Sequence, residues 1–315
     1  MRCLTCEGES RRFGRDRHGR QRFQCVVCGC TWTEPHADAT DGRRVSADKM
    51  IFCLRLLLED NSIRSAERLT GVNKETIIAA MVRAGENCRK FLAKKIRRIS
   101  VYDVQADEIW GYVGCKEKHR HLNNLPDCYG DAYCFTAIER NTKLMLAWHL
   151  GKRSTEDTYE FAVKLRAATC GHFQLTTDGW RPYCTAIPEV FGDSVDFAQL
   201  VKEYGDNDGE RQYSPPIVTG ISIKIRSGEP NVANICTSHV ERHNLTIRMQ
   251  VRRLTRLTNA FSKRWENHEA AIALFFAFYN WCRPHMTLKT TPAVASGLTD
   301  HVWSVPELLA NAGAA

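Results

Sequence analysis

The sequence lacks any apolar run close to the roughly 18 to 20 residues that a membrane span requires. Its first 30 residues are polar and rich in arginine, and they contain no apolar signal core. Of the 315 residues, 43% are hydrophobic and 25% are charged. A chain of this length and composition is expected to form two or three globular domains, one with a sizeable core. We therefore expect a cytoplasmic protein.

Acidic residues are scarce in two stretches of the chain. Residues 1–100 contain 21 Lys or Arg and 12 Asp or Glu, a difference of +9, while the whole chain carries +8. From Arg242 to Arg264 there are seven Lys or Arg and no acid. A solvated helix normally mixes its charges, although an ordinary surface helix is the simpler interpretation of the second stretch. Together the two stretches favour an anionic partner, and nucleic acid is favoured over a membrane because no basic amphipathic anchor is evident.

The 14 cysteines do not have the pattern of a secreted disulfide framework, because only four form tight pairs and the rest are scattered. Cys3 and Cys6 form one C-x2-C pair, and Cys25 and Cys28 form another after 18 intervening residues. This spacing predicts a structural zinc ribbon over residues 1–34. Four thiolates would close a tetrahedron and leave no position for a water molecule. Cys30 could replace Cys28, and redox cysteines are the alternative.

Residues 45–98 have the pattern of a helix-turn-helix domain. Before them, Glu34 to Arg44 is polar, contains proline and glycine, and is expected to be a linker. Helical spacing over 47–58 and 62–69 is followed by a turn at Gly71 and by Asn73, a suitable N-cap for a third helix. A small three-helix bundle would show the same pattern. If the third helix reads DNA, its candidate contacts are Lys74, Thr76 and Arg83.

The next region opens with six basic residues among the ten from Arg89 to Arg98, which favour a linker that follows DNA phosphates. From Ser100 the pattern alternates with a period of two, which predicts a strand. A regular strand would place Asp107 and Glu108 on opposite faces, so that only one of them could reach a site. Asp107 lies on the more polar face, and Glu108 is expected to be a buried hydrogen-bonding group.

Residues 100–285 are predicted to form an RNase H-like (retroviral-integrase-like) α/β domain, so the whole chain would be a multidomain α+β protein. Apolar runs at 132–138 and 144–150 would continue the first strand as an antiparallel meander. A helix over 154–169, a strand ending at Asp178 and a strand over 195–201 would follow. The stretch 202–234 is rich in turn residues and is expected to be an insertion. Two later helices, over 236–258 and 261–281, would pack on the sheet, and residues 286–315 would be a C-terminal extension.

In that fold the first and fourth strands are neighbours, so Asp107 and Asp178 could meet, and the helix over 236–258 would bring Glu241 close to them. Three carboxylates of this kind are typical of a site that holds two magnesium ions and activates a water or hydroxyl for attack on a phosphodiester.

Five phrases of the sequence resemble, in order, the transposases of the insertion-sequence-one family of bacterial mobile elements. The phrases are ADEIWGYVG, TTDGW, HVERHNLTIR, RRLTRLTNAFSK and FYNWCRPHMTLKTTPAVASGL. The resemblance implies an Asp-Asp-Glu triad at Asp107, Asp178 and Glu241. It also implies that Arg242, Asn244 and Arg248 belong to the same motif as Glu241. Because 62 residues separate Asp178 from Glu241, a nearer acid such as Asp193 or Asp196 could contribute.

The expected function is that of a DNA transposase using two catalytic Mg²⁺ (or Mn²⁺) ions and a structural Zn²⁺. The zinc ribbon and the helix-turn-helix would hold the terminal inverted repeats of double-stranded DNA, with Arg248 and Arg252 on the backbone. Water would cleave the transposon end, and the freed 3′-hydroxyl would attack target DNA. A homodimer or larger assembly is expected, located with the nucleoid when bound to DNA. The alternatives are a DNA-binding regulator that does not cut, and a nuclease without strand transfer.

Overall fold

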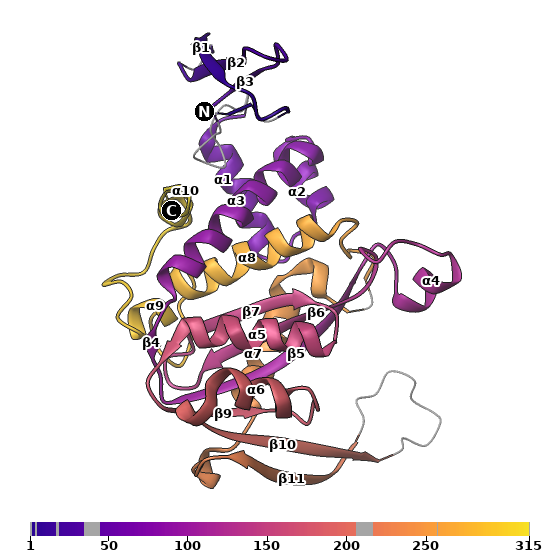
Figure 1. Ribbon diagram of the computed structural model, residues 1–315, viewed down its shortest axis with the longest axis vertical. Coiled ribbons are helices and arrows are strands. Elements are labelled where there is room, and N and C mark those ends of the chain that lie inside the picture. The colour runs from indigo at the N-terminus through magenta and orange to yellow at the C-terminus, as the bar shows by residue number, and fades with distance from the viewer. Residues whose placement is uncertain are drawn as a thin grey trace.

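The structure, a computed structural model, describes residues 2–3, 5–16, 19–34, 45–205, 217–256 and 258–314. The predicted linker after Glu34 lies outside the described residues, and so does the centre of the predicted insertion, residues 206–216. Figure 1 shows three parts: a small N-terminal sheet, a layer of helices, and a larger sheet with helices on both faces. Within the described residues, no helix is long and apolar enough to cross a membrane.

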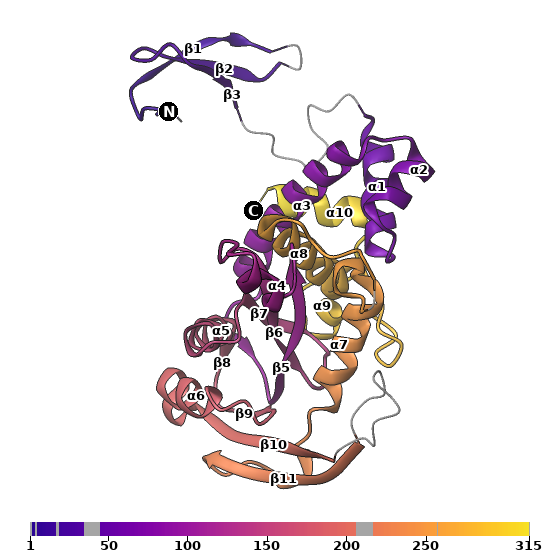
Figure 2. The same cartoon turned by 90° about the vertical axis from the view of Figure 1, so that its right-hand side faces the viewer.

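The N-terminal sheet has three antiparallel strands in sequential order, namely β1 (Ser10–Arg15), β2 (Gln21–Cys25) and β3 (Thr31–Thr33). It lies apart from the helices in Figures 1 and 2. Among its described hydrophobic residues only Cys3 and Cys25 are buried. Because two thiols cannot supply the apolar area that a domain of this size needs, the sheet requires some other source of stability.

Three helices follow in the expected helix-turn-helix order: α1 (Ala47–Leu58), α2 (Ile63–Thr70) and α3 (Lys74–Lys95). Gly71 ends α2 in the left-handed region, with a φ of 67°. Asn73 caps α3 by accepting a hydrogen bond from the Glu75 amide. The expectation of a basic linker from Arg89 was wrong, because α3 continues to Lys95. The continuation has a physical reason: Phe91 and Leu92 are buried and favour another helical turn.

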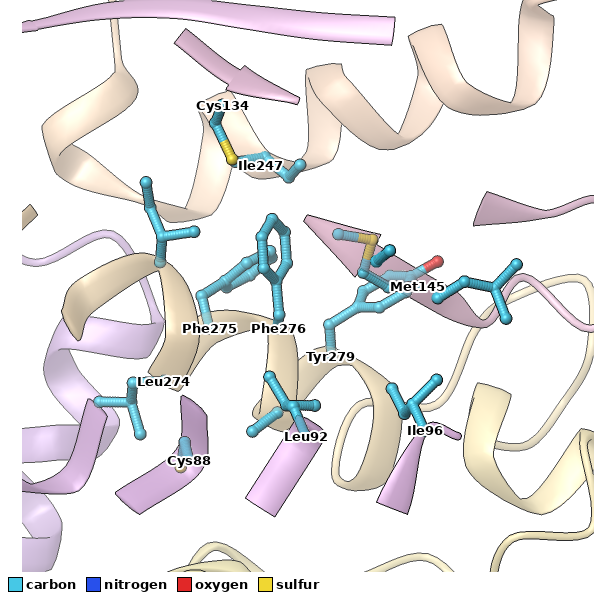
Figure 3. Close-up of a cluster of buried hydrophobic side chains, with 14 of the residues drawn as sticks. Cys88, Leu92, Ile96, Cys134, Met145, Ile247, Leu274, Phe275, Phe276 and Tyr279 are labelled. Carbon is cyan, nitrogen blue, oxygen red and sulfur yellow. The ribbon is translucent and has the colours of Figure 1, made fainter. Parts of the chain in front are cut away.

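Helix α8 (Trp265–Trp281) joins this helical layer to the large sheet. A Cβ atom on Gly85 of α3 would lie 2.1 Å from the Ala270 carbonyl oxygen of α8, so the two backbones touch at that glycine. In Figure 3, Phe275, Phe276 and Tyr279 of α8 lie between residues of α3 and residues of the sheet and α7. The region predicted as a helix-turn-helix domain therefore shares its hydrophobic core with the region predicted as catalytic.

The C-terminal residues return to the same core through α9 (Pro292–Ala295) and α10 (Val305–Gly313), the latter packing on α3. Trp303, just before α10, lies 5.8 Å from the ring of Phe91 and 6.0 Å from that of Trp281, between ring centroids. Rings at these distances stabilise the packing beyond their buried area. The predicted extension is therefore part of the helical layer.

The large sheet has six strands in the order β11-β10-β9-β5-β6-β7. Strands β5, β6 and β7 form the expected antiparallel meander, and β5 pairs with β9 in parallel, as predicted for the first and fourth strands. In Figure 2, α5 and α6 lie on one side of the sheet and α7 on the other.

The strands are β5 (Asp103–Val113), β6 (Gly130–Glu139), β7 (Met145–Gly151), β9 (Phe173–Thr177), β10 (Val195–Gly205) and β11 (Ile217–Ser227). The helices are α5 (Thr155–Ala168), α6 (Tyr183–Phe191) and α7 (Ser238–Gln250). Smaller elements are α4 (Glu117–Leu122), a two-stranded sheet of β4 (Ile99–Ser100) and β8 (Thr169–Cys170), and single 3-10 turns η1 (Gly192–Ser194), η2 (Val232–Asn234) and η3 (Arg252–Leu254).

Two predicted elements differ from the structure. The stretch expected to be turn-rich contains β11, which pairs with an extended β10 as an antiparallel edge strand. The predicted helix over 236–258 ends at Gln250 instead. After it, Val251 is extended, with φ and ψ of −103° and 93°, and η3 follows. The chain folds back there because the Arg248 guanidinium donates to the Leu254 carbonyl at 3.1 Å. Arg252 therefore does not continue the helical face of Arg248.

Candidate active site

Two neighbouring parallel strands bring Asp107 and Asp178 to the same level of the sheet. The last paired residues of β5 and β9 are Ala106 and Thr177, so each aspartate comes next along its strand. Asp178 lies just beyond the end of β9, and its Oδ1 accepts the Trp180 amide at 2.9 Å. An Asp-Gly turn at the carboxyl end of a parallel strand is a common way to aim a carboxylate at a shared site.

Asp107 is held from two sides. Its Oδ1 accepts the Glu108 amide at 2.8 Å, and its Oδ2 accepts the Asn244 side-chain amide at 2.8 Å. The Thr136 hydroxyl of β6 lies 3.2 Å from Asn244 Oδ1 and donates to it, which turns the amide nitrogen of Asn244 toward the carboxylate. Asn244 is buried. The structure therefore places this predicted DNA contact against Asp107.

Glu108 lies closer to the site than the strand pattern predicted. Its side chain is buried on the opposite face, only 3% exposed, and its Oε1 has no hydrogen-bond partner among the described residues. Nevertheless, one oxygen each of Asp107, Glu108 and Asp178 all lie within 4.8 Å of one another. The expectation that only one of the adjacent acids could reach a site was wrong, because Asp178, just beyond the end of β9, lies within 4.8 Å of both.

Glu241 approaches from α7. Its Oε1 accepts the Thr237 hydroxyl at 2.6 Å and also contacts the Lys202 ammonium of β10. Its side chain is 43% exposed. Glu241 is not part of the compact acid cluster, but its charge raises the pKa of both Asp107 and Asp178, so it lies within electrostatic reach of them.

The acid cluster holds more negative charge than its surroundings compensate. Burial, followed by the charge of Asp178, raises the pKa of Asp107 to about 7 and that of Glu108 to about 8. Burial also raises the pKa of Asp178. Buried carboxylates that resist ionisation are stabilised by a cation, and oxygen ligands of this type suit Mg²⁺ and Mn²⁺. The residues present therefore fit a divalent metal site.

Arg153 contacts two acids of the cluster, and it was not among the predicted site residues. Its Nε donates to Glu108 Oε2 at 3.2 Å, and its Nη2 lies 3.6 Å from Asp178 Oδ2. The guanidinium also lies 4.1 Å from the centre of the Trp180 ring. Its place between β7 and the Ser154 cap of α5 was the available signal, because that turn faces the carboxyl end of the sheet.

The nearer acids Asp193 and Asp196 do not belong to the cluster, which within the described residues comprises Asp107, Glu108 and Asp178. Asp196 binds His172 at 2.8 Å and the Glu229 amide at 2.9 Å. These donors, against the effect of burial, lower the pKa of Asp196. Asp196 therefore connects the start of β10 to His172 and Glu229.

Comparisons with known proteins bear on this arrangement. The sequence pattern of the IS1 (insertion sequence one) transposases matches residues 222–281, which include α7 and α8. The insertion element iso-IS1n protein InsB of Shigella dysenteriae is 26% identical over 171 residues, covering 54% of this chain and 91% of that protein. Over these regions the chain is similar to the IS1 transposases. A cryo-EM structure of the piggyBac transposase synaptic complex with hairpin DNA aligns with a TM-score of 0.38 and 12% identity, over 86% of this chain and 71% of that one.

The four paired cysteines converge at one end of the N-terminal sheet. The sulfur of Cys3 lies 3.6 Å from that of Cys28, and the sulfur of Cys6 lies 3.5 Å from that of Cys25. A tetrahedron with zinc–sulfur bonds of ~2.3 Å has edges of about 3.8 Å, so the spacing fits a metal site made of four cysteines. Backbone amides donate to the thiols, as at Thr5 to Cys3 at 3.4 Å. Cys30 is exposed and is not part of the cluster among the described residues.

The predicted DNA contacts of this transposase lie in different surroundings. Lys74 and Arg242 are exposed, whereas Thr76 and Arg83 on α3 are half-buried. Arg248 donates to the carbonyls of Leu254 and Trp110, at 3.1 and 3.2 Å, and burial lowers its pKa to about 10. Arg252 forms an ion pair with Asp60 at 3.2 Å. Contact of these residues with DNA stays a prediction.

Proposed function

We propose that this DNA transposase cleaves the ends of its element and joins them to target DNA at the acid cluster, with Asp107, Asp178 and Glu241 as the triad. The observation that carries the proposal is the meeting of Asp107 and Asp178 at adjacent strand ends, with Glu241 near enough to raise the pKa of both. The strand order β7-β6-β5-β9-β10, with only β6 antiparallel to its neighbours within it, supports an RNase H-like domain.

In the proposed reaction, a water oxygen bonds to phosphorus at the element end. The bond from phosphorus to the 3′ oxygen breaks, and that oxygen leaves as a hydroxyl with a proton from the water. The same hydroxyl then attacks a target phosphodiester and releases a second hydroxyl. Two Mg²⁺ or Mn²⁺ ions would supply charge neutralisation at the attacking and leaving oxygens. Asp107, Asp178 and Glu241 would hold them.

The protein's own groups contribute orientation. Asn244 fixes Asp107, and the Trp180 amide fixes Asp178, so neither carboxylate has to be ordered when substrate binds. Lys202 beside Glu241 and Arg153 beside Glu108 are positioned to neutralise phosphate oxygens or to hold the acids in place. Zinc in the four-cysteine cluster would stabilise the N-terminal ribbon, which together with α2 and α3 would bind the terminal repeats. Two ends must be joined together, so a homodimer or larger assembly is proposed.

The test is a Mg²⁺-dependent assay on a plasmid carrying the DNA that flanks the gene. We expect nicks at the element ends, followed by joined products. Asp107→Asn, Asp178→Asn and Glu241→Gln should each abolish both while leaving DNA binding intact. Asp193→Asn, an exposed acid outside the cluster, is the matched control.

Other outcomes separate the alternatives. Binding without nicking by the unaltered protein would indicate a DNA-binding regulator, and nicking without joining would indicate a nuclease. Glu108→Gln belongs in the same series because Glu108 lies in the acid cluster. If the Glu108→Gln variant is inactive and the Glu241→Gln variant is active, the third metal ligand is Glu108 on β5 instead of Glu241 on α7. That result would overturn the proposed triad.

A further inference from the structure

A basic cavity of about 850 Å³ lies where the helix-turn-helix meets the segment between α7 and α8. Its walls come from the α1–α2 turn, the first turns of α3, residues 250–253 and 258–264, and the start of α8. Among its lining residues in the described part of the chain, Glu75 is the only acidic one. The basic lining residues are Arg64, Lys74, Arg252, Arg253, Lys263 and Arg264.

Arg253 is half-buried, whereas most other cations of this cavity are exposed. Its guanidinium donates to the Ser262 hydroxyl at 2.9 Å and to the Met81 sulfur at 3.4 Å, and among the described residues it forms no ion pair. Burial lowers its pKa to about 10. A guanidinium withdrawn from water without a carboxylate is unfavourable unless an anion compensates it. Arg252 differs, because Asp60 already pairs with it.

Exposed cations also line the cavity. Lys74, Lys263 and Arg264 are exposed, and none of them forms an ion pair within the part of the chain that the structure describes. Lys263 lies over the Phe261 ring, 3.4 Å from its centre, which keeps the ammonium at the mouth. Positive charge thus extends from the interior to the surface over several chain segments. A single small anion would engage only part of this surface, whereas a nucleic acid backbone would follow it.

We propose that this basic cavity is a phosphodiester site, which holds the DNA backbone between the helix-turn-helix and the active site. The cavity includes the first turns of α3, and its lining residues 250–253 follow directly on the helix that carries Glu241. A phosphate held by Arg253 would fix the distance between the DNA segment bound at α3 and the segment to be cut. The inference rests on the proposed function only in taking DNA as the ligand.

The test measures binding of the full-length protein to labelled duplex DNA from the element ends, by fluorescence anisotropy over a range of salt concentrations. Magnesium is omitted, so that cleavage plays no part. Each lost phosphate contact should reduce the slope of log K against log salt by about 0.9. Arg264→Gln should therefore reduce it by about 0.9, and Lys263→Gln combined with Arg264→Gln by about 1.8. Arg166→Gln, which removes one exposed guanidinium from α5, is the matched control and should leave the slope unchanged.

Arg253→Gln probes the interior of the cavity, and Arg253→Lys, which keeps the charge, should restore part of the lost affinity. Melting temperatures identify a variant that fails to fold. If an Arg253 variant does so, the proposal is tested by the surface variants at Lys263 and Arg264 alone. Unchanged slopes in the surface variants would overturn the proposal. Displacement of DNA by millimolar inorganic phosphate, with unchanged slopes, would identify a free-phosphate site and overturn it as well. Loss of cleavage in the Asp107→Asn variant, with a normal salt slope, would bear only on the acid cluster, so the two proposals can fail separately.

Discussion

The acid cluster should make the metal-free protein less stable as the pH rises. In the folded protein the pKa of Asp107 is raised to about 7 from its ordinary 3.8. Between those values the folded state binds a proton that the unfolded state has released, so the free energy of unfolding falls as pH increases through this window. The difference corresponds to about 4 kcal/mol for an isolated group, at about 1.4 kcal/mol per tenfold change in acidity. Because Glu108 and Asp178 titrate in contact with Asp107, their contributions do not simply add.

Asp107→Asn removes this charge while retaining a group that can bind Asn244. We expect the metal-free variant to be more stable than the unaltered protein at pH 8 by about 2 to 4 kcal/mol, and by a smaller margin of about 1 to 2 kcal/mol at pH 5, which is still above the unfolded pKa. In a chain of this size the difference at pH 8 corresponds to roughly 5 to 10 °C in melting temperature. Excess Mg²⁺ should stabilise the unaltered protein at pH 8 by about 3 kcal/mol at a hundred times the dissociation constant, and should not stabilise the variant.

The measurement is a thermal melt at pH 5, 6.5 and 8 in magnesium-free buffer without a chelator, so that the cysteine cluster keeps its metal. Asp193→Asn is the control, because Asp193 is exposed and lies outside the cluster. Equal melting temperatures for the Asp107→Asn variant and the unaltered protein at pH 8 would refute the reasoning. That result would mean that water or a neighbouring cation already compensates the carboxylates.

Three further predictions concern the supports of the site. Asn244→Ala removes an amide that lowers the pKa of Asp107, so the acid limb of the pH–cleavage profile should move to higher pH. Gly85→Val should lower the free energy of unfolding by about 2 to 4 kcal/mol, seen as a lower melting temperature, because the valine side chain would meet the Ala270 backbone. The control is Ala79→Val on the exposed side of α3, which should have little effect. Cys25→Ser should abolish bound zinc, measured by atomic absorption, and weaken binding to element ends, while the helical circular dichroism stays unchanged because the ribbon contains no helix among its described residues.

The sequence predicted those parts of the site that depend on local pattern. Alternation in β5 and the Asp-Gly turn after β9 were sufficient to bring Asp107 and Asp178 to one sheet edge, because neighbouring parallel strands end at the same level. Glu108 was misjudged because alternation describes residues within a regular strand, whereas Asp178 lies beyond the end of its own strand and comes within 4.8 Å of both adjacent acids. Arg153 had a local signal in its place between β7 and α5, but that place alone does not assign a role, since the role depends on contacts with Glu108 and Trp180 across the fold.

The edge strand β11 was missed for a different reason. Its side chains alternate between apolar residues such as Ile221 and Ile223 and polar ones such as Ser222, but the glycines and prolines around it dominated the interpretation. The end of α7 was also misplaced, because the predicted helix continued over 236–258. In the structure Arg248 turns inward to backbone carbonyls, and this tertiary contact ends the helix where periodicity would have continued it.

The shared core has a consequence for how DNA reading and chemistry are connected. A helix-turn-helix on a basic linker could take many orientations, and the bound repeat would have to find the acid cluster by diffusion. Here α3 packs on α8 through a direct backbone contact at Gly85, and α8 packs on the sheet that carries Asp107. The distance between the two regions is therefore set by a hydrophobic core, so a DNA segment bound at α3 would meet the cluster at a fixed spacing. Changing that spacing requires disrupting the core itself, so if the proposed function holds, we expect substitutions at the α3–α8 contact to shift the position of cleavage as well as to lower stability.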